Sequence, residues 1–330
     1  MAELELLFEH PETGEIYAYK PSSCSLAQER TCTASTLTGT IPDVTGAVIR
    51  MGSTCRLFAD GKCIFWGFVF QATIDRWGVM NFTAHDVLRY LRNTYSNAYK
   101  KGYKPKTVIE DICKAFNVKT GFIEDIPATG YQLLCDNESG LDIISKLVDT
   151  ATVLTTKIIV LYAEEDKVCL RYAEDMIRDE VVGDDSLATE YTLSISIDDD
   201  TYNQIFLYRE SSETGARQFV SAPKNGQSPN VKKWGVLRYT EAADDGMTTA
   251  QMQDKADKLL EMKNREYKTM SIDALGIVGL RAGQMITIDF PSLADSVSKR
   301  QMVCVDAVTH NFEDSTHTMS LDVRTFWRDS

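Results

Sequence analysis

The 330-residue chain lacks the long apolar run and the basic leader that would direct a protein into or across a membrane. No stretch approaches the roughly 18 uninterrupted apolar residues that a spanning helix needs. Residues 1–5 are acidic, whereas a signal peptide begins with basic residues. We therefore expect synthesis in a cytoplasm and no membrane insertion.

The sequence also lacks clustered metal ligands, because its four histidines are dispersed and its cysteines occur singly, without a Cys-x-x-Cys pair. Neither a zinc site nor a dithiol redox site has the required ligand spacing. Buried free thiols are the better interpretation. The cysteines are Cys24, Cys32, Cys55, Cys63, Cys113, Cys135, Cys169 and Cys304.

Cys55 and Cys63 flank the probable turn 60–61, which has the sequence Asp-Gly. A two-residue hairpin loop pairs Cys63 with Phe58 and Cys55 with Trp66. Because successive side chains alternate between the faces of a sheet, this register places the two sulfurs on opposite faces. We predict no disulfide here.

Positive charge is scarce: 35 Lys and Arg against 48 Asp and Glu give a net charge of −13. Such a chain repels a phosphate backbone unless a local basic stripe overrides the mean. The candidate stripe is 99–106, with four lysines and two tyrosines, which we interpret as a solvated linker. An acidic wall would let DNA pass without binding it.

Recognisable catalytic motifs are absent as well, including a Gly-x-Ser-x-Gly elbow, a Walker loop and a cysteine in a catalytic context. Carboxylates are abundant at Asp184, Asp185 and 198–200. Glycoside hydrolysis needs two acids at a set separation, one with its pKa raised by burial. Runs of acids between strands are usually exposed, so these residues do not predict a hydrolase.

The histidines give weak candidates for a site. His85 opens a helix among apolar neighbours, which favours a capping or core contact over a general base, and His10 ends a strand. A cluster near the C-terminus has the composition of a metal site, but a hairpin turn of this kind is usually solvated. That cluster comprises His310, Glu313, Asp314 and His317.

The sequence is rich in patterns that predict β-strands. At 43% hydrophobic residues, the chain can bury the cores of two or three compact units. The first ninety residues predict short strands with frequent turns, which favours a small barrel or sandwich. The predicted strands are 3–6, 14–19, 55–58, 63–70, 72–75 and 79–83.

The pattern then changes to helical periodicity. Thr83 to Asp86 resemble a capping box before a short helix, Thr107 opens a second helix, and Ser139 opens a third. Residues 158–162 and 167–172 predict a hairpin that turns at 164–166. The apolar positions expected to be buried are Val87, Leu88, Leu91, Val108, Ile109, Ile112, Cys113, Phe116, Leu141, Ile144, Leu147, Val148 and Ala151.

Strands return at 190–197 and 202–208, and a long helix is predicted at about 248–267. Its core face carries Met252, Ala256, Leu259 and Leu260. The final segments 281–288, 301–310 and 318–323 are strands suited to a closed barrel. Isolated glycines, including Gly67 and Gly283, are best explained as bulges or tight strand bends.

This order of parts resembles the baseplate hub proteins of contractile phage tails and phage-tail-like bacteriocins, in the branch found in Gram-positive defective prophages. Three matching stretches together span nearly the whole chain. The stretches are Phe65–Val69 with Phe82–Leu91, then Thr107–Ile112 with Leu141–Ile144, and finally Trp234–Tyr239 with its helix and the ending Val308–Phe312 and Thr318–Leu321.

The resemblance implies an α+β, mainly β protein with two tube-type β-barrel domains, at 1–95 and 183–330, and a small mixed domain at 96–182. It implies a homotrimer that presents six barrels in a ring between the sixfold tail tube and the threefold central spike. Other baseplate and lysin-motif tail proteins would surround it, and DNA could pass through the lumen. The expected location is the baseplate of a particle assembled in a bacterial cytoplasm.

Two other classes of function remain as alternatives: a tail-associated peptidoglycan hydrolase and a wall-binding module. The second depends on a faint likeness of Thr107–Phe116 to the first helix of a lysin-motif repeat. We predict a structural protein instead, with no catalytic, cofactor-binding or metal-binding residues.

Overall fold

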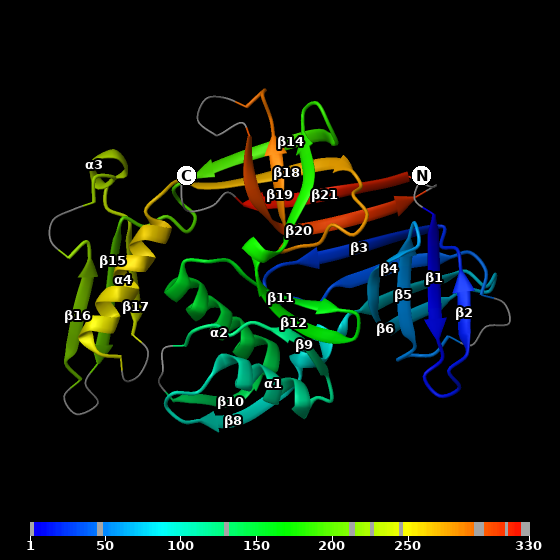
Figure 1. Ribbon diagram of the computed structural model, residues 1–330, viewed down its shortest axis with the longest axis horizontal. Helices are drawn as coiled ribbons and strands as arrows, with labels where there is room; N and C mark the ends of the chain where they lie inside the picture. Colours follow the sequence, from blue (N-terminus) through cyan, green and yellow to red (C-terminus); the bar gives the residue numbers. More distant parts are fainter. Residues whose placement is uncertain are drawn as a thin grey trace.

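The computed structural model describes residues 3–44, 49–128, 132–210, 215–224, 228–243, 247–293, 300–313 and 316–324. The predicted fold class is confirmed: the protein is mainly β, with one 13-stranded sheet and three smaller sheets (Figure 1).

The N-terminal half of the large sheet packs around its own apolar core, which includes Leu6, Phe8, Leu37, Leu57 and Phe82. Sequence patterns did not predict β3 and β4, because serine, threonine and glycine dilute their apolar alternation. The strands of this half are β1 Leu4–Glu9, β2 Ile16–Tyr19, β3 Ser23–Glu29, β4 Thr36–Ile41, β5 Thr54–Ala59, β6 Lys62–Ile74 and β7 Met80–His85.

The β5–β6 hairpin turns at Asp60 and Gly61, whose φ values are both positive (50° and 73°). This is the backbone that a two-residue Asp-Gly turn favours, because it matches the twist of the flanking strands. Phe58 pairs with Cys63, as the turn predicts.

A β-bulge next to this pair shifts the register, so Cys55 faces Gly67. The expectation that Cys55 faces Trp66 is therefore wrong by one position, because periodicity alone does not reveal a bulge. Cys55 is buried and Cys63 is exposed, and the eight cysteines are free thiols.

Both glycines singled out in the sequence allow close approaches. A Cβ on Gly67 would lie 2.4 Å from the carbonyl oxygen of His85 on the neighbouring strand. Gly283 has a φ of +87°, and a Cβ there would lie 2.2 Å from Val160 of the middle unit. Only glycine fits these positions without a shift of the neighbour.

The middle unit packs α1 and α2 against a short three-stranded sheet and a two-stranded sheet (Figure 1). The predicted apolar faces are confirmed, although the short helix after Asp86 is a 3₁₀ helix and Phe116 is only partly buried. Its elements are η1 Val87–Arg92, β8 Thr94–Tyr99, α1 Pro105–Ala115, β9 Lys119–Ile123, β10 Leu133–Ser139, α2 Gly140–Thr155, β11 Ile159–Glu164, β12 Lys167–Tyr172 and η2 Ala173–Asp175.

The C-terminal half of the large sheet has a second core, which includes Ile272, Ile286, Phe290, Val305 and Leu321. The strands of this half are β13 Ile177–Gly183, β14 Ala188–Ser196, β18 Tyr267–Leu275, β19 Met285–Asp289, β20 Arg300–Glu313 and β21 Thr316–Arg324.

The segment between β14 and β18 forms a separate three-stranded sheet covered by the predicted long helix, at the left of Figure 1. The helix starts at a capping box of Thr248 and Gln251, and Met252, Ala256 and Leu259 face this sheet. The elements are β15 Gln204–Glu210, β16 Arg217–Ala222, α3 Val231–Trp234, β17 Arg238–Ala242 and α4 Thr249–Lys263.

The two halves of the large sheet have the same strand order. The N-terminal half runs β3-β4-β7-β6-β5-β1, and the C-terminal half runs β14-β18-β21-β20-β19-β13. The correspondence is not complete, since β1 is antiparallel to β5 whereas β13 is parallel to β19. The chain therefore contains an internal structural repeat.

A bulge occurs at the same place in both repeats. It lies between Val69 and Gln71 in the pairing of β6 with β7, and between Val305 and Ala307 in the pairing of β20 with β21. β6 and β20 are also the two longest strands described. The bulges give a residue-by-residue alignment of the repeats.

The repeats join where β20 pairs antiparallel with β3, residues 307–313 opposite residues 23–29. Beside this junction, Asp306 accepts hydrogen bonds from Arg30 (2.7 Å) and Arg324 (2.6 Å). The described pairings form an open path of strands, so closure of each half into a cylinder and the domain boundaries at 95 and 182 stay predictions.

Candidate assembly surface and junction cleft

The face of the large sheet that points away from both cores is polar. Its groove in the N-terminal half has a volume of about 510 Å³. Cross-strand hydrogen bonds hold the side chains, from Ser25 to Asn311 (2.9 Å) and from Thr40 to Asn81 (2.7 Å). Two cross-strand rows line the groove: Gln71, Thr83, Thr38, Ser25 and Asn311, and Thr73, Asn81, Thr40, Ser23 and Glu313.

The same face continues into the C-terminal half with more carboxylates. Ser271 donates to Asp322 and Ser320 donates to Asp273, both at 2.6 Å. A face of hydroxyls, amides and carboxylates offers no patch of cations to hold a phosphate backbone.

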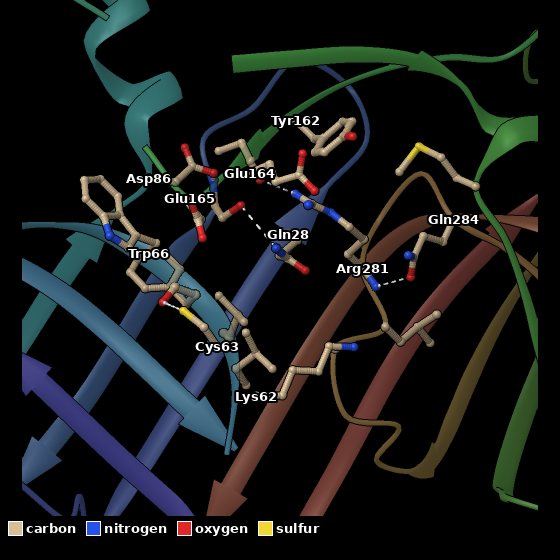
Figure 2. A pocket seen from close by; sticks show the side chains of 18 of the residues that line it. Gln28, Lys62, Cys63, Trp66, Asp86, Tyr162, Glu164, Glu165, Arg281 and Gln284 are labelled. Carbon is tan, nitrogen blue, oxygen red and sulfur yellow. Dashed lines mark hydrogen bonds between the residues drawn. The ribbon is translucent and has the colours of Figure 1, made fainter. Parts of the chain in front are cut away.

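A cleft of about 560 Å³ lies where the two halves and the middle unit meet (Figure 2). Asp86 is fully buried at one end of this cleft, and both its oxygens accept backbone hydrogen bonds, from Ser35 (2.9 Å) and Leu88 (3.0 Å). Burial raises the pKa of Asp86 to about 6. The carboxylate caps η1 and connects the residue before β4 to the middle unit.

Arg281 crosses the cleft towards the middle unit. Its guanidinium lies 4.3 Å from the centre of the Tyr162 ring and donates to the carbonyl of Ala163 (2.9 Å). Burial lowers the pKa of Arg281. Its Nε is buried without a hydrogen-bond partner in the described part of the chain. Arg281 therefore links the C-terminal half to β11.

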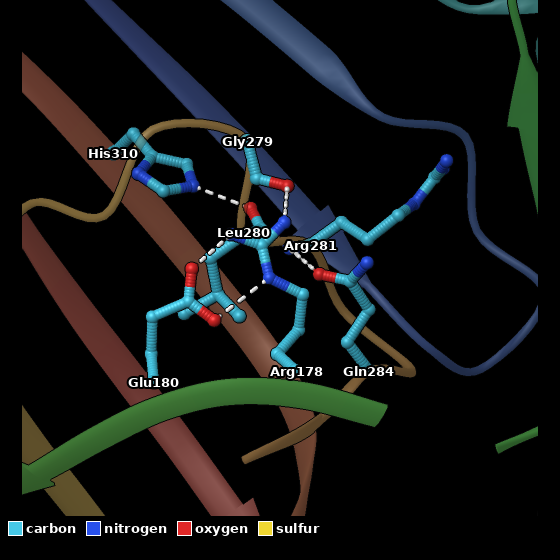
Figure 3. A network of polar contacts seen from close by, with 7 residues as sticks. All are labelled: Arg178, Glu180, Gly279, Leu280, Arg281, Gln284 and His310. Atoms are coloured by element: carbon cyan, nitrogen blue, oxygen red, sulfur yellow. Dashed lines mark hydrogen bonds and ion pairs between the residues drawn. The ribbon is translucent and has the colours of Figure 1, made fainter. Parts of the chain in front are cut away.

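The loop that carries Arg281 is held by a polar network (Figure 3). The Nε2 of His310 donates to the carbonyl of Leu280 (2.7 Å), and the backbone of Arg281 donates to Gln284 (3.0 Å). Arg178 is ion-paired to Glu180 and reaches towards this loop. These contacts fix the loop against β13 and β20.

His310 and His317 are brought together, 3.0 Å apart between ring nitrogens. Because a carbonyl only accepts, the Nε2 of His310 carries the proton, and its Nδ1 accepts from His317. Burial lowers the pKa of both rings, that of His317 to about 4 with a further contribution from His310. The pair is a neutral structural contact at pH 7.

The other members of that predicted cluster do not complete a metal site. Glu313 lines the polar groove, and Asp314 lies outside the described residues. The described residues hold no group of three or more histidine, cysteine or acidic side chains arranged for a metal.

The remaining candidates have local structural roles. His85 contacts Thr36 (3.1 Å) across two strands, and the Nδ1 of His10 accepts from Glu12 and Thr13 in a turn. Asp184 accepts from the backbone of Ser292 (2.9 Å). Asp185 and residues 198–200 are exposed, as are Lys100, Lys101 and Lys104.

The sequence did not predict the roles of Asp86 and Arg281. The capping pattern at 83–86 predicts only a local contact for Asp86. The strand pattern at 281–288 predicts no partner for the side chain of Arg281. Their hydrogen bonds to Ser35 and Ala163 span 51 and 118 positions, and no local pattern encodes such partners. In the described residues, no helix is long and apolar enough to cross a bilayer.

The fold is that of prophage tail proteins. The 43 kDa tail protein of prophage MuSo2 from Shewanella oneidensis matches 98% of this chain and 99% of its own, with a TM-score of 0.72 at 8% identity. The Escherichia coli c3393 protein, a type VI secretion component described as similar to T4 tail proteins gp27 and gp5, matches 99% of this chain and 75% of its own, with a TM-score of 0.58 at 8% identity.

The chain belongs to the YQBQ-like family, whose model matches residues 24–324. It is 29% identical over 283 residues to the phage-like element PBSX protein XkdQ of Bacillus subtilis, covering 85% of this chain and 84% of that protein. Family and fold together confirm that the chain resembles proteins of phage tails and phage-like elements, as the sequence indicated.

Proposed function

We propose that the chain is the structural hub of a contractile tail or tail-like particle. It would assemble as a homotrimer into a pseudo-sixfold ring, which joins the hexameric tail tube to the trimeric spike. The relatives named as tail and phage-element proteins support this proposal. The observation that carries it is the internal repeat, since a chain with two equivalent units lets three copies meet a sixfold partner.

The polar face of the large sheet would line the lumen of this ring. Its hydroxyls, amides and carboxylates would repel or ignore a phosphate backbone, so DNA would pass without being retained. The particle baseplate, assembled in a bacterial cytoplasm, is the location that follows. Lysin-motif and other baseplate proteins would contact the outside of the ring.

The role is structural and not enzymatic. The acids and cations of the junction cleft join distant segments: Asp86 accepts from the backbone of Ser35, and Arg281 and Arg178 donate to the carbonyls of Ala163 and Gly279. These contacts position the parts of the chain relative to one another, which is what an assembly protein requires.

Native mass spectrometry of the purified chain with its spike and tube proteins tests the proposal. We expect complexes that contain three copies of this chain. A chain that stays monomeric and binds neither partner would contradict a hub. In a parallel assay with purified peptidoglycan we expect no turnover, and turnover abolished by His310→Ala would support the hydrolase alternative instead.

A further inference from the structure

Among the open strand edges of the large sheet in the described chain, those of β14 and the end of β6 have counterparts that are paired within the chain. β14 ends the path of strands and pairs on one side only, with β18. β6 pairs with β5 only up to Phe68, so residues 70–74 have β7 on one side and no strand on the other. Open edges present unpaired backbone groups that another strand can bind.

The internal repeat shows what belongs at each edge. Alignment at the bulges places Phe70 at the position of Asp306, and Ile74 at the position of His310. The strand pairings can then be followed from β7 through β4 to β3, and from β21 through β18 to β14. They place Leu193 of β14 at the position of Leu26 of β3. The two open edges are thus the counterparts of β20 and β3, which pair with each other.

We propose that β6 of one copy pairs antiparallel with β14 of the next copy, in the register that β20 and β3 use within the chain. The inference rests on the proposed ring and specifies its contact. The expected pairs are Gln71 with Ser196, Ala72 with Ile195, Thr73 with Ser194, and Ile74 with Leu193.

Burial supports this pairing. At the junction within the chain, His310 and Leu26 are each 1% exposed. At the open edges, Ile74, the counterpart of His310, is 56% exposed, and Leu193, the counterpart of Leu26, is only partly buried. Ile195, the counterpart of the buried Gln28, is 42% exposed. Exposed apolar side chains on unpaired strand edges indicate a surface that is covered in an assembly.

One substitution between the repeats fits a contact between separate chains. Within the chain, Asp306 binds Arg30 beside the junction. The counterparts of this ion pair are Phe70 and Ile197, both 36% exposed. An apolar pair contributes to association by leaving water, whereas an ion pair at a partly exposed site contributes little.

A turn limits the open edge of β6 at its other end. The β6–β7 turn is fixed by Asp75, which accepts from the backbones of Trp77 (2.8 Å) and Val79 (3.0 Å). It presents Arg76 stacked 4.3 Å from the centre of the Trp77 ring, which is 71% exposed. The strand pairing therefore ends at Ile74, where this turn begins.

A second copy is the occupant that these observations favour over an unrelated protein. Each edge is the counterpart of a strand whose partner the chain itself supplies, so each copy carries both halves of the contact. Such a contact is heterologous, and repetition around an axis closes it into a ring without leaving an edge.

Disulfide trapping tests the register. The backbone N–H of Arg30 donates to the backbone carbonyl of Asp306. Every second residue of β20 from Asp306 onwards therefore directs its backbone groups to β3. Thr309 and Ala27 therefore form a non-hydrogen-bonded pair, in which side chains approach most closely. Their counterparts are Thr73 and Ser194, both exposed and suited to cysteine substitution.

The test variant carries Thr73→Cys and Ser194→Cys with Cys63→Ser, which removes the exposed native thiol. A matched control carries Thr73→Cys and Thr192→Cys, two residues along β14, where the separation of about 7–8 Å is too long for a disulfide. Both are oxidised at high protein concentration, alone and with the spike protein, then compared on non-reducing gels. Trapping captures transient contacts as well as stable ones.

We expect covalent oligomers from the test variant and at least tenfold fewer from the control. Equal cross-linking of both variants, or none in the test variant, would overturn the pairing. Light scattering of the uncross-linked wild type with the spike protein separates the two proposals. A trimer whose test variant does not cross-link refutes only the strand contact, whereas a persistent monomer refutes the hub.

Discussion

The two repeats of the large sheet share a strand order and a bulge but differ at their edges. β20 and β3 pair with each other within the chain, and an ion pair lies beside them. The edges of β6 and β14 are unpaired and carry exposed apolar side chains. Equivalent strand edges of the two repeats therefore differ in whether they are paired within the chain. One edge stabilises the chain, and we propose that the other serves assembly.

The largest expected effect separates the two edges by stability. Leu26→Ala removes a side chain that is 1% exposed, so we expect a loss of about 2–5 kcal/mol in the free energy of unfolding. Its counterpart Leu193 is only partly buried, so Leu193→Ala should cost about 1 kcal/mol. Urea denaturation of both variants measures this. Equal losses would contradict the distinction between the edges.

The ion pair and its apolar counterpart should also differ. Asp306→Ala leaves Arg30 and Arg324 without their partner, and we expect a loss of about 2 kcal/mol, since these side chains keep some contact with water. Phe70→Ala should cost the monomer about 1 kcal/mol, because the partly exposed ring packs against rings of β7 and η1, and it should in addition reduce association. Thermal unfolding and light scattering on the same samples test both statements. A Phe70→Ala protein that assembles normally would argue against the proposed contact.

His317 and Asp86 make opposing contributions to the pH dependence of stability, and the lowered pKa of His310 acts in the same direction as that of His317. His317 has a folded pKa of about 4, below the ordinary value of 6.5, so its contribution is present above pH 6.5 and is lost as the pH falls towards 4. Asp86 has a folded pKa of about 6, above the ordinary value of 3.8. Its contribution is present below pH 3.8 and is lost as the pH rises through 6.

Single variants separate these contributions. With His317→Gln, stability between pH 4 and 6 should decrease as the pH rises, because the Asp86 contribution remains. With Asp86→Asn, the free energy of unfolding should increase as the pH rises from 4 to 6.5, by about 0.7 kcal/mol per pH unit. This is half of the roughly 1.4 kcal/mol per pH unit expected for a fully buried group, because His317 keeps some contact with solvent. Urea titrations at several pH values measure the slopes. Unchanged slopes in both variants would show that other groups control the titration.

The smallest effect concerns metal. Zinc should shift the melting temperature by less than about 1 °C, because His310 already uses one ring nitrogen for the Leu280 carbonyl and the other for His317. Differential scanning fluorimetry with and without zinc checks this. A larger shift that disappears in His317→Gln would restore the metal interpretation of the cluster.

The sequence predicted the elements whose signals are local. The Asp60-Gly61 turn, the Ser139 and Thr248 helix caps and the apolar faces of α1, α2 and α4 all agree with the structure. Each depends on residues within one or two turns of chain, where capping and periodicity act.

The sequence did not predict what depends on distant pairing. β3 has only two apolar aliphatic residues among its seven, and its place beside β20 depends on partners nearly 300 residues away. The bulges at Phe70 and Asp306 have no sequence signature, although they allow the repeats to be aligned. The contacts of Arg281 likewise follow from the meeting of three parts of the chain.

The most direct test of the account is the mass of the oxidised variant with Thr73→Cys, Ser194→Cys and Cys63→Ser, measured under denaturing, non-reducing conditions. A ring of three copies joined edge to edge predicts a species of three chains linked by three disulfides. A product that stops at single chains, even with spike protein present, would contradict it.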